Sequence, residues 1–474
     1  MKLFFNFKLN FKEIHQMFVT TAILATTALT SGQDTQIEVL TELVQELRHE
    51  VSELKNDQST NWSNDQRADE IRSLVHDVLA DADSRASLQG SSALAGYDGG
   101  AFLMSADGNW KLIINGQIQT RWLYNKASDQ KLLATPLENS QYGFDQRRTK
   151  VKFSGHILDP SWQYKITTTW ARGGESVTED AYIQKSLDNG SWFKFGQFKA
   201  NFLRENIVSS SKQLTVERSM LDNAFTYGWT QGIEFGWKND DVKLLVQYTD
   251  GPNQSNTPAL QDPVDAWIVR GEFRFGDADW KDFDYLTSKN GAKNGLLLGI
   301  AYQNFDIDTL DNSTESDIEY GNAAAFSSNG WTIDASWRGD GWNVFGYYVD
   351  STAKGFNDVG EQDSSGWLIQ AGVMMNDNLE LFGQYQEGNI KDATFTNGSD
   401  DMDVIRVGFN YWPVAGSNNV KWSSDVAWAG KSLAAGGTSG ISSADWVSDG
   451  NGWRGDQGLN DDQMLIRTQL QLLF

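Results

Sequence analysis

From residue 110 to the C-terminus, apolar and polar positions alternate along the chain with a period of two. The last strand shows this most clearly. Apolar side chains or threonine occupy every second position from Met464 to Phe474, whereas Arg467, Gln469 and Gln471 lie between them. Alternation of this kind predicts β-strands with one apolar face and one polar face.

Sixteen segments follow this pattern, and the connections after even-numbered segments are mostly tight, whereas those after odd-numbered segments are mostly long. The segments are 110–124, 145–158, 161–171, 179–187, 190–198, 228–238, 240–249, 264–276, 294–303, 327–337, 341–350, 364–376, 379–389, 402–412, 419–430 and 461–474. Many are long enough to cross a bilayer at the tilt of a barrel strand. The pattern predicts an all-β fold, a 16-stranded antiparallel transmembrane β-barrel over residues 110–474. The connection 277–293 is too long for a simple periplasmic turn.

The first 109 residues have a different character. Lysines followed by the apolar stretch 17–29 and small residues predict a signal peptide over 1–32, the alternative being an amphipathic helix kept in the mature protein. In 33–90, β-branched residues and leucines recur every seven positions, which predicts a helical coiled-coil extension that pairs with other copies of the chain. The residue types favour two strands, and the short seam leaves a trimer open. A stretch rich in Ser, Ala and Gly predicts a linker over 91–109.

Composition narrows the function. The chain has 474 residues and no cysteine, which excludes disulfides, thiolate metal sites and cysteine nucleophiles. Its net charge of −24 argues against nucleic acid as a partner, because phosphate backbones require a basic surface. No pattern calls for a cofactor, and no acidic run has the spacing of an EF-hand calcium loop.

The polar face of the strands is basic although the protein is acidic. If the apolar face meets lipid, the polar face lines a lumen. Fifteen bases then point inward: Lys111, Arg121, Arg148, Lys150, Lys152, Lys165, Lys194, Lys238, Lys243, Arg270, Arg274, Arg338, Arg406, Lys421 and Arg467. Five acids share that face: Glu234, Glu272, Asp334, Glu380 and Asp425. A confined positive lumen lowers the barrier for anions. The alternative is that these bases pair with acids and stabilise the barrel.

The connection 199–227 is the candidate for narrowing such a pore. It carries Lys212 and Arg218 among polar residues, and its apolar residues predict packing against the barrel wall. Wide barrels leave an aqueous channel, so selectivity needs an inward-folded segment.

Four segments of the barrel resemble the phosphate-selective porins O and P. They are Arg147-Arg148 with Gly155, the run KFGQF at 194–198 followed by FLRENIVSSSKQLTVERSM at 202–220, Val269 to Phe273, and VGFNYWPVAGSNNVKW at 407–422 with the final LIRTQLQLLF. The resemblance implies a homotrimeric 16-stranded barrel in the bacterial outer membrane, with a third outer loop that constricts the pore. It also implies that Arg147, Arg148, Lys212, Arg218 and Arg270 guide phosphate-like anions.

The sequence therefore predicts an anion-selective porin. Its partners are outer-membrane lipid and small anions such as phosphate, and its helical extension lies in the periplasm. The proposed anion-binding or constriction residues are Arg147, Arg148, Lys150, Lys152, Lys212, Arg218, Arg270 and Arg274.

Three alternatives remain open. A general or carbohydrate porin needs an aromatic track in the lumen, for which Phe345, Tyr347 and Phe382 leave room. A structural barrel anchoring the envelope would use the coiled coil for contact with the cell wall. A barrel enzyme would depend on His156, which has no nucleophile motif nearby, so the sequence predicts no catalytic site and no metal site.

Overall fold

The computed structural model describes residues 45–46, 93–127, 140–170, 174–257, 264–307, 327–354, 361–390, 401–431, 433, 446, 450–454 and 462–474. The chain divides into two units, Met1–Ser87 and Leu88–Phe474. In the first unit, residues 45 and 46 are helical. The signal peptide predicted at 1–32 and all but these two residues of the coiled coil predicted at 33–90 lie outside the described residues, so both stay predictions.

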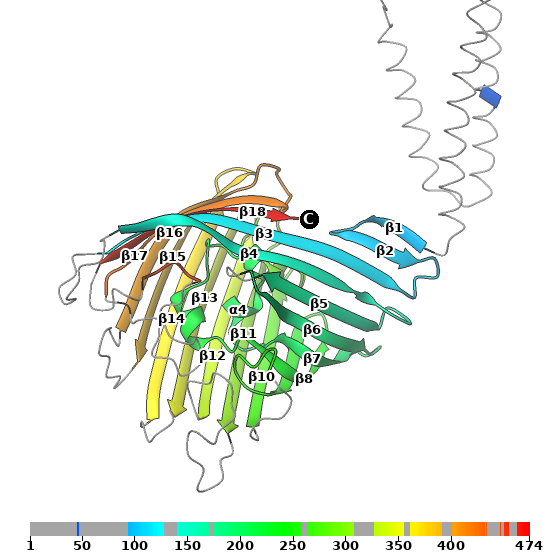
Figure 1. Ribbon diagram of the computed structural model, residues 1–474, viewed down its shortest axis with the longest axis horizontal. Helices are drawn as coiled ribbons and strands as arrows, with labels where there is room; N and C mark the ends of the chain where they lie inside the picture. The colour runs from blue at the N-terminus through cyan, green and yellow to red at the C-terminus, as the bar shows by residue number, and fades with distance from the viewer. Residues whose placement is uncertain are drawn as a thin grey trace, which may run out of the picture. The chain divides into compact units, whose positions relative to one another are not determined.

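Sixteen antiparallel strands of the second unit form a closed barrel (Figure 1). They are β3 (Lys111–Lys126), β4 (Ser140–His156), β5 (Trp162–Trp170), β6 (Ser176–Ser186), β7 (Ser191–Lys199), β8 (Trp229–Lys238), β9 (Val242–Thr249), β10 (Val264–Gly276), β11 (Gly295–Ile307), β12 (Ser327–Gly339), β13 (Trp342–Lys354), β14 (Glu361–Met374), β15 (Leu379–Ile390), β16 (Asp401–Tyr411), β17 (Val420–Ala429) and β18 (Gln463–Leu473). Strand β18 pairs with β3 from Met464 opposite Lys126 to Leu473 opposite Gln117, which closes the barrel. All sixteen predicted segments correspond to these strands, so the prediction of the barrel is confirmed.

Strand β10 shows the predicted alternation, with apolar side chains on the outer surface and polar side chains on the inner one. Trp267, Val269 and Phe273 are 40–48% exposed on the outer surface, whereas Arg270 and Glu272 are each 1% exposed on the inner one. The apolar side chains face outward, where they can meet lipid, and the polar side chains face the lumen. Closure of the sheet pairs the backbone groups of the strands, as crossing a bilayer requires. Among the described residues, no helix combines the length and apolar character needed to span a membrane.

Two short strands lie in the interval predicted as a linker, 91–109. Strand β1 (Ala93–Tyr97) pairs with β2 (Ala101–Ser105), and β2 continues the sheet along Lys111–Ile114 at the start of β3. The sequence prediction missed them because each strand has only five residues. A strand of that length carries too few alternating positions to stand out from a segment rich in small residues.

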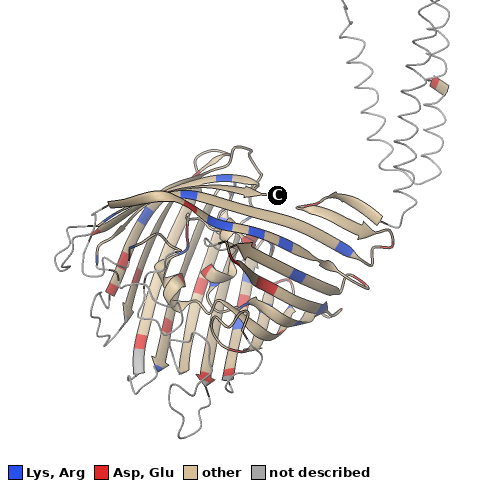
Figure 2. Cartoon of the chain, in the orientation of Figure 1, with Lys and Arg blue, Asp and Glu red and all other residues tan. Residues whose placement is uncertain are grey.

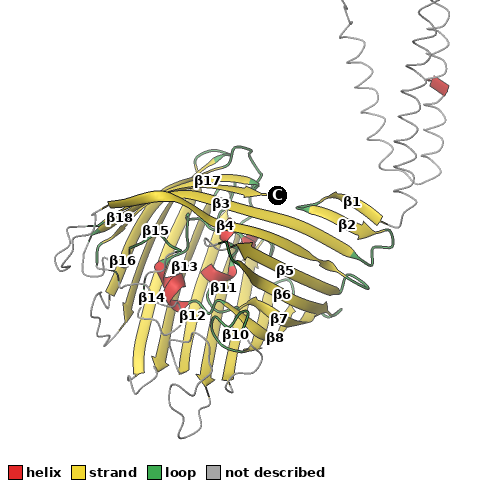
Figure 3. Cartoon of the chain, in the orientation of Figure 1, coloured by secondary structure: helices red, strands yellow, loops and turns green. Residues whose placement is uncertain are grey.

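The connection between β7 and β8, residues 200–228, folds into the barrel and is called loop 3 below. It contains α4 (Arg204–Ile207), η1 (Ser210–Lys212) and α5 (Met220–Phe225), visible inside the sheet in Figure 3. Phe202, Leu214 and Leu221 are each fully buried in a cluster with wall residues such as Leu368 and Val404. The predicted packing of this loop against the wall is confirmed, and the apolar core of the protein lies between loop 3 and the inner surface of the barrel.

The connection between β10 and β11, residues 277–294, also has ordered structure and is called the inner segment below. It contains η2 (Asp282–Asp284), and it buries Phe283 against Leu297 of the barrel wall. The unusual length of this connection in the sequence thus corresponds to a folded element.

Candidate cation-lined pore site

Two register shifts change which side chains reach the lumen. The β3–β4 ladder shifts between Gln119 and Thr120, which leaves Arg147 unpaired beside Arg148. The β5–β6 ladder shifts between Thr167 and Thr168, so that Glu179, beside Asp180, has no residue opposite it in the ladder. A bulge of this kind turns the chain so that consecutive residues share one face. The two bulged strands, β4 and β6, therefore each present two adjacent charged residues to the interior.

Glu217 of loop 3 is the common partner of three arginines from β3 and β4. Its carboxylate oxygens lie 3.2 Å from Arg121 Nη1, 2.6 Å from Arg147 Nε and 2.6 Å from Arg148 Nη2. Burial alone would raise the pKa of Glu217, but the charges of Arg147, Arg148 and Arg121 outweigh burial and hold that pKa well below its usual range. Glu217 is therefore an anion that fixes loop 3 to this wall.

Strands β16 and β17, which adjoin this wall through β18, hold loop 3 through its backbone. Arg406 Nη1 donates to the carbonyl of Glu217 at 2.9 Å, Asn410 Nδ2 to that of Leu214 at 2.8 Å, and Lys421 Nζ to that of Gln213 at 2.9 Å. Buried carbonyls of an irregular segment need such donors. Loop 3 is thus attached to one arc of the wall that runs from β16 through β18 to β4, and several lumen bases serve its attachment.

A cavity of about 610 Å³ lies between loop 3 and β4–β8, and it is called the cationic cavity below. It reaches Trp170, the last residue of β5, so it lies toward the long-loop end of the barrel. Seven bases line it: Arg147, Arg148, Lys150, Lys152, Lys165, Lys199 and Arg218. Among the residues that the structure describes, only two acids line it, Glu179 and Asp180. Figure 2 shows Lys and Arg, in blue, recurring along β4.

The bases of the cationic cavity differ in how far they are neutralised. Lys150 lies 2.5 Å from Glu179, and Lys165 lies 2.9 Å from Asp180. Lys199 donates to a backbone carbonyl at 2.9 Å and lies 4.3 Å from the centre of the Trp229 ring. The charges of Lys150 and Lys165 are thus partly compensated by acids, whereas Lys199 has no acid in direct contact within the described part of the chain.

Lys152 is the base of the cavity most available to an anion, whereas Arg218 is largely engaged by loop 3. Within the described residues, Lys152 makes no hydrogen bond and no ion pair, and its side chain is half-buried. Arg218 donates to three carbonyls of loop 3, including Val208 at 2.7 Å, and has Asp222 at 3.8 Å. An ammonium group without a partner retains all three of its donors for a passing ligand.

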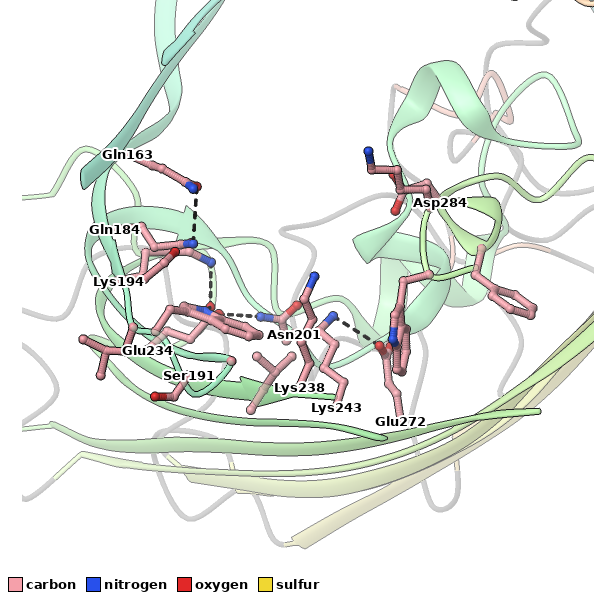
Figure 4. Close-up of a pocket in the computed structure, with 18 of the residues that line it drawn as sticks. Gln163, Gln184, Ser191, Lys194, Asn201, Glu234, Lys238, Lys243, Glu272 and Asp284 are labelled. Carbon is pink, nitrogen blue, oxygen red and sulfur yellow. Dashed lines mark hydrogen bonds and ion pairs between the residues drawn. The ribbon is translucent and has the colours of Figure 1, made fainter. Parts of the chain in front are cut away.

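A second cavity of about 530 Å³, called the inner cavity below, lies toward the short-turn end, where it reaches Leu187 and Gly190. Figure 4 shows Gln163 and Gln184 on one side of it and Asp284 of the inner segment on the other, with Lys243 paired to Glu272 between them. Its bases are Lys194, Arg204, Lys238, Lys243 and Lys281, and its acids are Glu234, Glu272 and Asp284. The inner cavity is therefore close to balanced, in contrast to the cationic cavity.

The structure brings five of the eight predicted site residues together. Arg147, Arg148, Lys150, Lys152 and Arg218 all line the cationic cavity. Sequence reasoning left out of the site five residues that belong to it: Lys165, Lys199, Glu179, Asp180 and Glu217. The two acids of β6 were missed because a bulge cannot be read from alternation, whereas the adjacent pair Arg147-Arg148 was a usable signal.

The other three predicted residues lie elsewhere. Lys212 on η1 pairs with Asp284 at 3.1 Å. Arg270 is 1% exposed and pairs with Asp334 at 2.8 Å in the wall. Arg274 donates to the carbonyls of Asp240 and Ala278, each at 2.6 Å, at the short-turn rim.

The inward aromatic residues do not form an open track. Phe345, Tyr347 and Phe382 are 1–5% exposed and belong to the cluster covered by loop 3. A stacking surface for sugar rings must be accessible, so these three do not provide one. Among the described residues, no group of His, Asp and Glu is arranged to hold a metal ion. His156 Nε2 lies 2.8 Å from the carbonyl of Gly108 near the β2–β3 turn.

The closed barrel, the infolded loop and its cation-lined cavity define a porin-like β-barrel. The family model of the phosphate-selective porins O and P matches residues 122–275, which confirms the resemblance seen in the sequence. The matched range runs from β3 to β10 and includes all of loop 3.

Solved porins share the fold. A form of OmpT of Vibrio cholerae lacking loop L8 has a TM-score of 0.50 at 8% identity, covering 77% of this chain and 100% of that chain. The outer membrane channel DcaP of Acinetobacter baumannii has a TM-score of 0.50 at 11% identity, covering 80% and 100%. An anion-selective porin from Comamonas acidovorans has a TM-score of 0.50 at 12% identity, covering 77% and 99%. No curated protein matches the chain.

Proposed function

We propose that this protein forms a water-filled, anion-selective diffusion channel for phosphate or polyphosphate. The observation that carries the proposal is the cationic cavity, in which seven bases face two acids within a protein whose net charge is −24. An acidic protein that concentrates bases at the narrowing loop of its barrel creates a local potential opposite in sign to its overall charge.

The arrangement suits passage of an anion better than its retention. Arg147 and Arg148 share Glu217, and Lys150 and Lys165 each have an acid at hand, so most of the positive charge is partly compensated. Conduction requires sites that attract the ion but release it. Lys152 supplies an ammonium group that has no ion pair among the described residues. The partly compensated bases beside it in the cationic cavity give a weaker positive potential on either side.

Two comparisons support the choice of ligand. The matching family is described as phosphate-selective, and one porin of the same fold is described as anion-selective. Charge-assisted hydrogen bonds to phosphate oxygens are the chemistry that arginine and lysine provide best.

The remaining parts of the proposal concern assembly and location. A homotrimer is proposed from the family resemblance, and OmpT of Vibrio cholerae, which shares the fold, is described in a trimer form. Residues 33–90 are proposed to extend into the periplasm as a coiled coil that contacts the cell wall. Outer-membrane lipid surrounds the exposed apolar band, and the protein is proposed to have no enzymatic activity.

Phosphate block of chloride current tests this function. The full chain is reconstituted in a planar bilayer in potassium chloride, and inorganic phosphate is added at pH 7. We expect chloride current to fall with saturating dependence at millimolar phosphate, because phosphate occupies the sites that chloride uses. A chloride current that does not respond to phosphate would remove phosphate from the proposal, and a current carried by potassium would remove anions altogether.

A further inference from the structure

The inner segment is anchored to the short-turn rim of the barrel. Ser288 Oγ donates to the carbonyl of Gly339 at 2.6 Å, Lys289 Nζ donates to that of Ser417 at 2.8 Å, and Gly341 N donates to that of Lys289 at 3.1 Å. These bonds attach it to two connections of the wall, the β12–β13 turn and the β16–β17 connection. The inner segment is therefore fixed inside the barrel at its short-turn end.

The inner segment also contacts loop 3 directly. Leu286 N donates to the carbonyl of Lys212 at 3.0 Å, and Arg204 Nη2 donates to the carbonyl of Phe283. The Lys212 ammonium lies 3.1 Å from Asp284 Oδ2 and 4.4 Å from the centre of the Tyr285 ring. One side of the Lys212 ammonium thus meets a carboxylate and an aromatic face, both supplied by the inner segment.

The Lys212–Asp284 pair stands between the two cavities. Asp284 lines the inner cavity, where Figure 4 shows it facing the open space. Lys212 is the last residue of η1, whose first residue, Ser210, lines the cationic cavity. An anion that leaves the cationic cavity toward the short-turn end next meets Lys212, whose charge Asp284 already compensates.

We propose that Asp284 is a specificity-determining residue of the pore, a displaceable counter-ion that sets how strongly Lys212 holds a passing anion. The inference rests on the proposed anion channel. The side chain of Asp284 is 57% exposed and that of Lys212 is 27% exposed, so the pair is hydrated and each partner can exchange. A phosphate dianion competes with Asp284 for the ammonium, and the returning carboxylate then favours release of the anion into the inner cavity.

Neutralising Asp284 tests this role. In Asp284→Asn channels, we expect the phosphate concentration that halves chloride current to fall about two- to fivefold, the range expected for a partly exposed ion pair. In Lys212→Gln channels it rises by a similar factor. The double variant should match Lys212→Gln alone, because Asp284 acts through Lys212.

A matched control lies in the same segment. Asp279 pairs with Lys293 at 3.2 Å and does not line either cavity, so Asp279→Asn removes the same charge from the same segment without touching Lys212. It should leave phosphate block unchanged. Asp284→Ser repeats the test if the asparagine variant assembles poorly.

The outcomes separate this inference from the proposed function. A wild-type channel that prefers cations overturns both. A wild-type channel that is blocked by phosphate, combined with no change in Asp284→Asn, overturns the role of Asp284 alone. The role is also overturned if Asp284→Asn changes phosphate block equally in the wild-type and Lys212→Gln backgrounds. Asp284 would then act on the anion through its own charge and not through Lys212.

Discussion

Arg148 and Glu217 bind each other across the interior of the barrel, with Arg148 Nη2 2.6 Å from Glu217 Oε1 although 69 positions separate them in the chain. Arg148 belongs to the basic face of β4 that the sequence assigned to anions, and Glu217 belongs to the loop that narrows the pore. The same arginine therefore both lines the cationic cavity and fixes loop 3.

Replacement of Glu217 by glutamine should loosen loop 3. The buried carboxylate neutralises Arg121, Arg147 and Arg148, and removal of one partner from such a network costs about 3–5 kcal/mol. We expect a lower free energy of unfolding in detergent and noisier open-channel current. Asp188→Asn, in the tight turn between β6 and β7, is the control and should resemble wild type. Wild-type stability and noise in Glu217→Gln would show that loop 3 is held by other contacts.

Lys152→Gln should weaken anion binding without weakening the fold. Within the described residues, Lys152 has no ion pair to lose, so the free energy of unfolding should stay within about 0.5 kcal/mol of wild type. Phosphate block of chloride current should weaken severalfold, because the uncompensated ammonium is lost. Lys293→Gln, which removes an ammonium that is 58% exposed, serves as the control. Unchanged block would place the anion site elsewhere.

Arg270→Met should affect assembly more than conduction. Arg270 pairs with Asp334 and Glu272 inside the wall, and breaking such a buried pair costs about 3–5 kcal/mol. We expect a lower unfolding temperature and unchanged phosphate block in the channels that do form. The double variant Arg270→Met with Asp334→Leu should recover part of the stability, since apolar residues replace both charges. A large loss of phosphate block in stable channels of these variants would instead show that Arg270 belongs to the anion-binding site.

The stability of loop 3 should depend on pH through Glu205. Burial raises the pKa of Glu205 to about 7, and the neighbouring charge of Asp222 acts in the same direction. Between the ordinary value of 4.5 and about 7, the folded form then binds more protons than the unfolded form. Stability from this group is therefore complete at low pH and is lost as pH rises through 7.

Urea unfolding in detergent from pH 4.5 to 8 measures this effect. The decline in unfolding free energy attributable to Glu205, on the order of 3 kcal/mol, should be absent in Glu205→Gln. If the variant and wild type decline in parallel, folding does not raise the pKa of Glu205.

The sequence was sufficient for the barrel because its signal is repeated along every strand. Parity in β10 and β18 correctly assigned Arg270 and Arg467 to the interior, where both are 0–1% exposed. Parity could not reveal their partners, since Asp334 lies two strands away from Arg270 and Asp425 lies on the strand next to Arg467, in a register set by the fold. A count of inward bases alone thus overstates the free positive charge of the lumen.

The candidate site was predictable only in part, for two physical reasons. Bulges bring adjacent residues such as Glu179 and Asp180 to one face, and alternation contains no sign of them. Loop 3 places Glu217 among arginines of β3 and β4 through long-range packing, which local patterns do not determine. The length of the 277–293 connection was a real signal, although the sequence did not show that this segment reaches Lys212.

Reversal potential is the most direct measurement of the central claim, that the cationic cavity makes this barrel anion-selective. Wild-type channels are reconstituted in a planar bilayer with a tenfold gradient of potassium chloride. A reversal potential on the side of the chloride equilibrium potential, moved toward zero in Lys152→Gln, is the predicted result. A reversal potential on the potassium side would contradict the account.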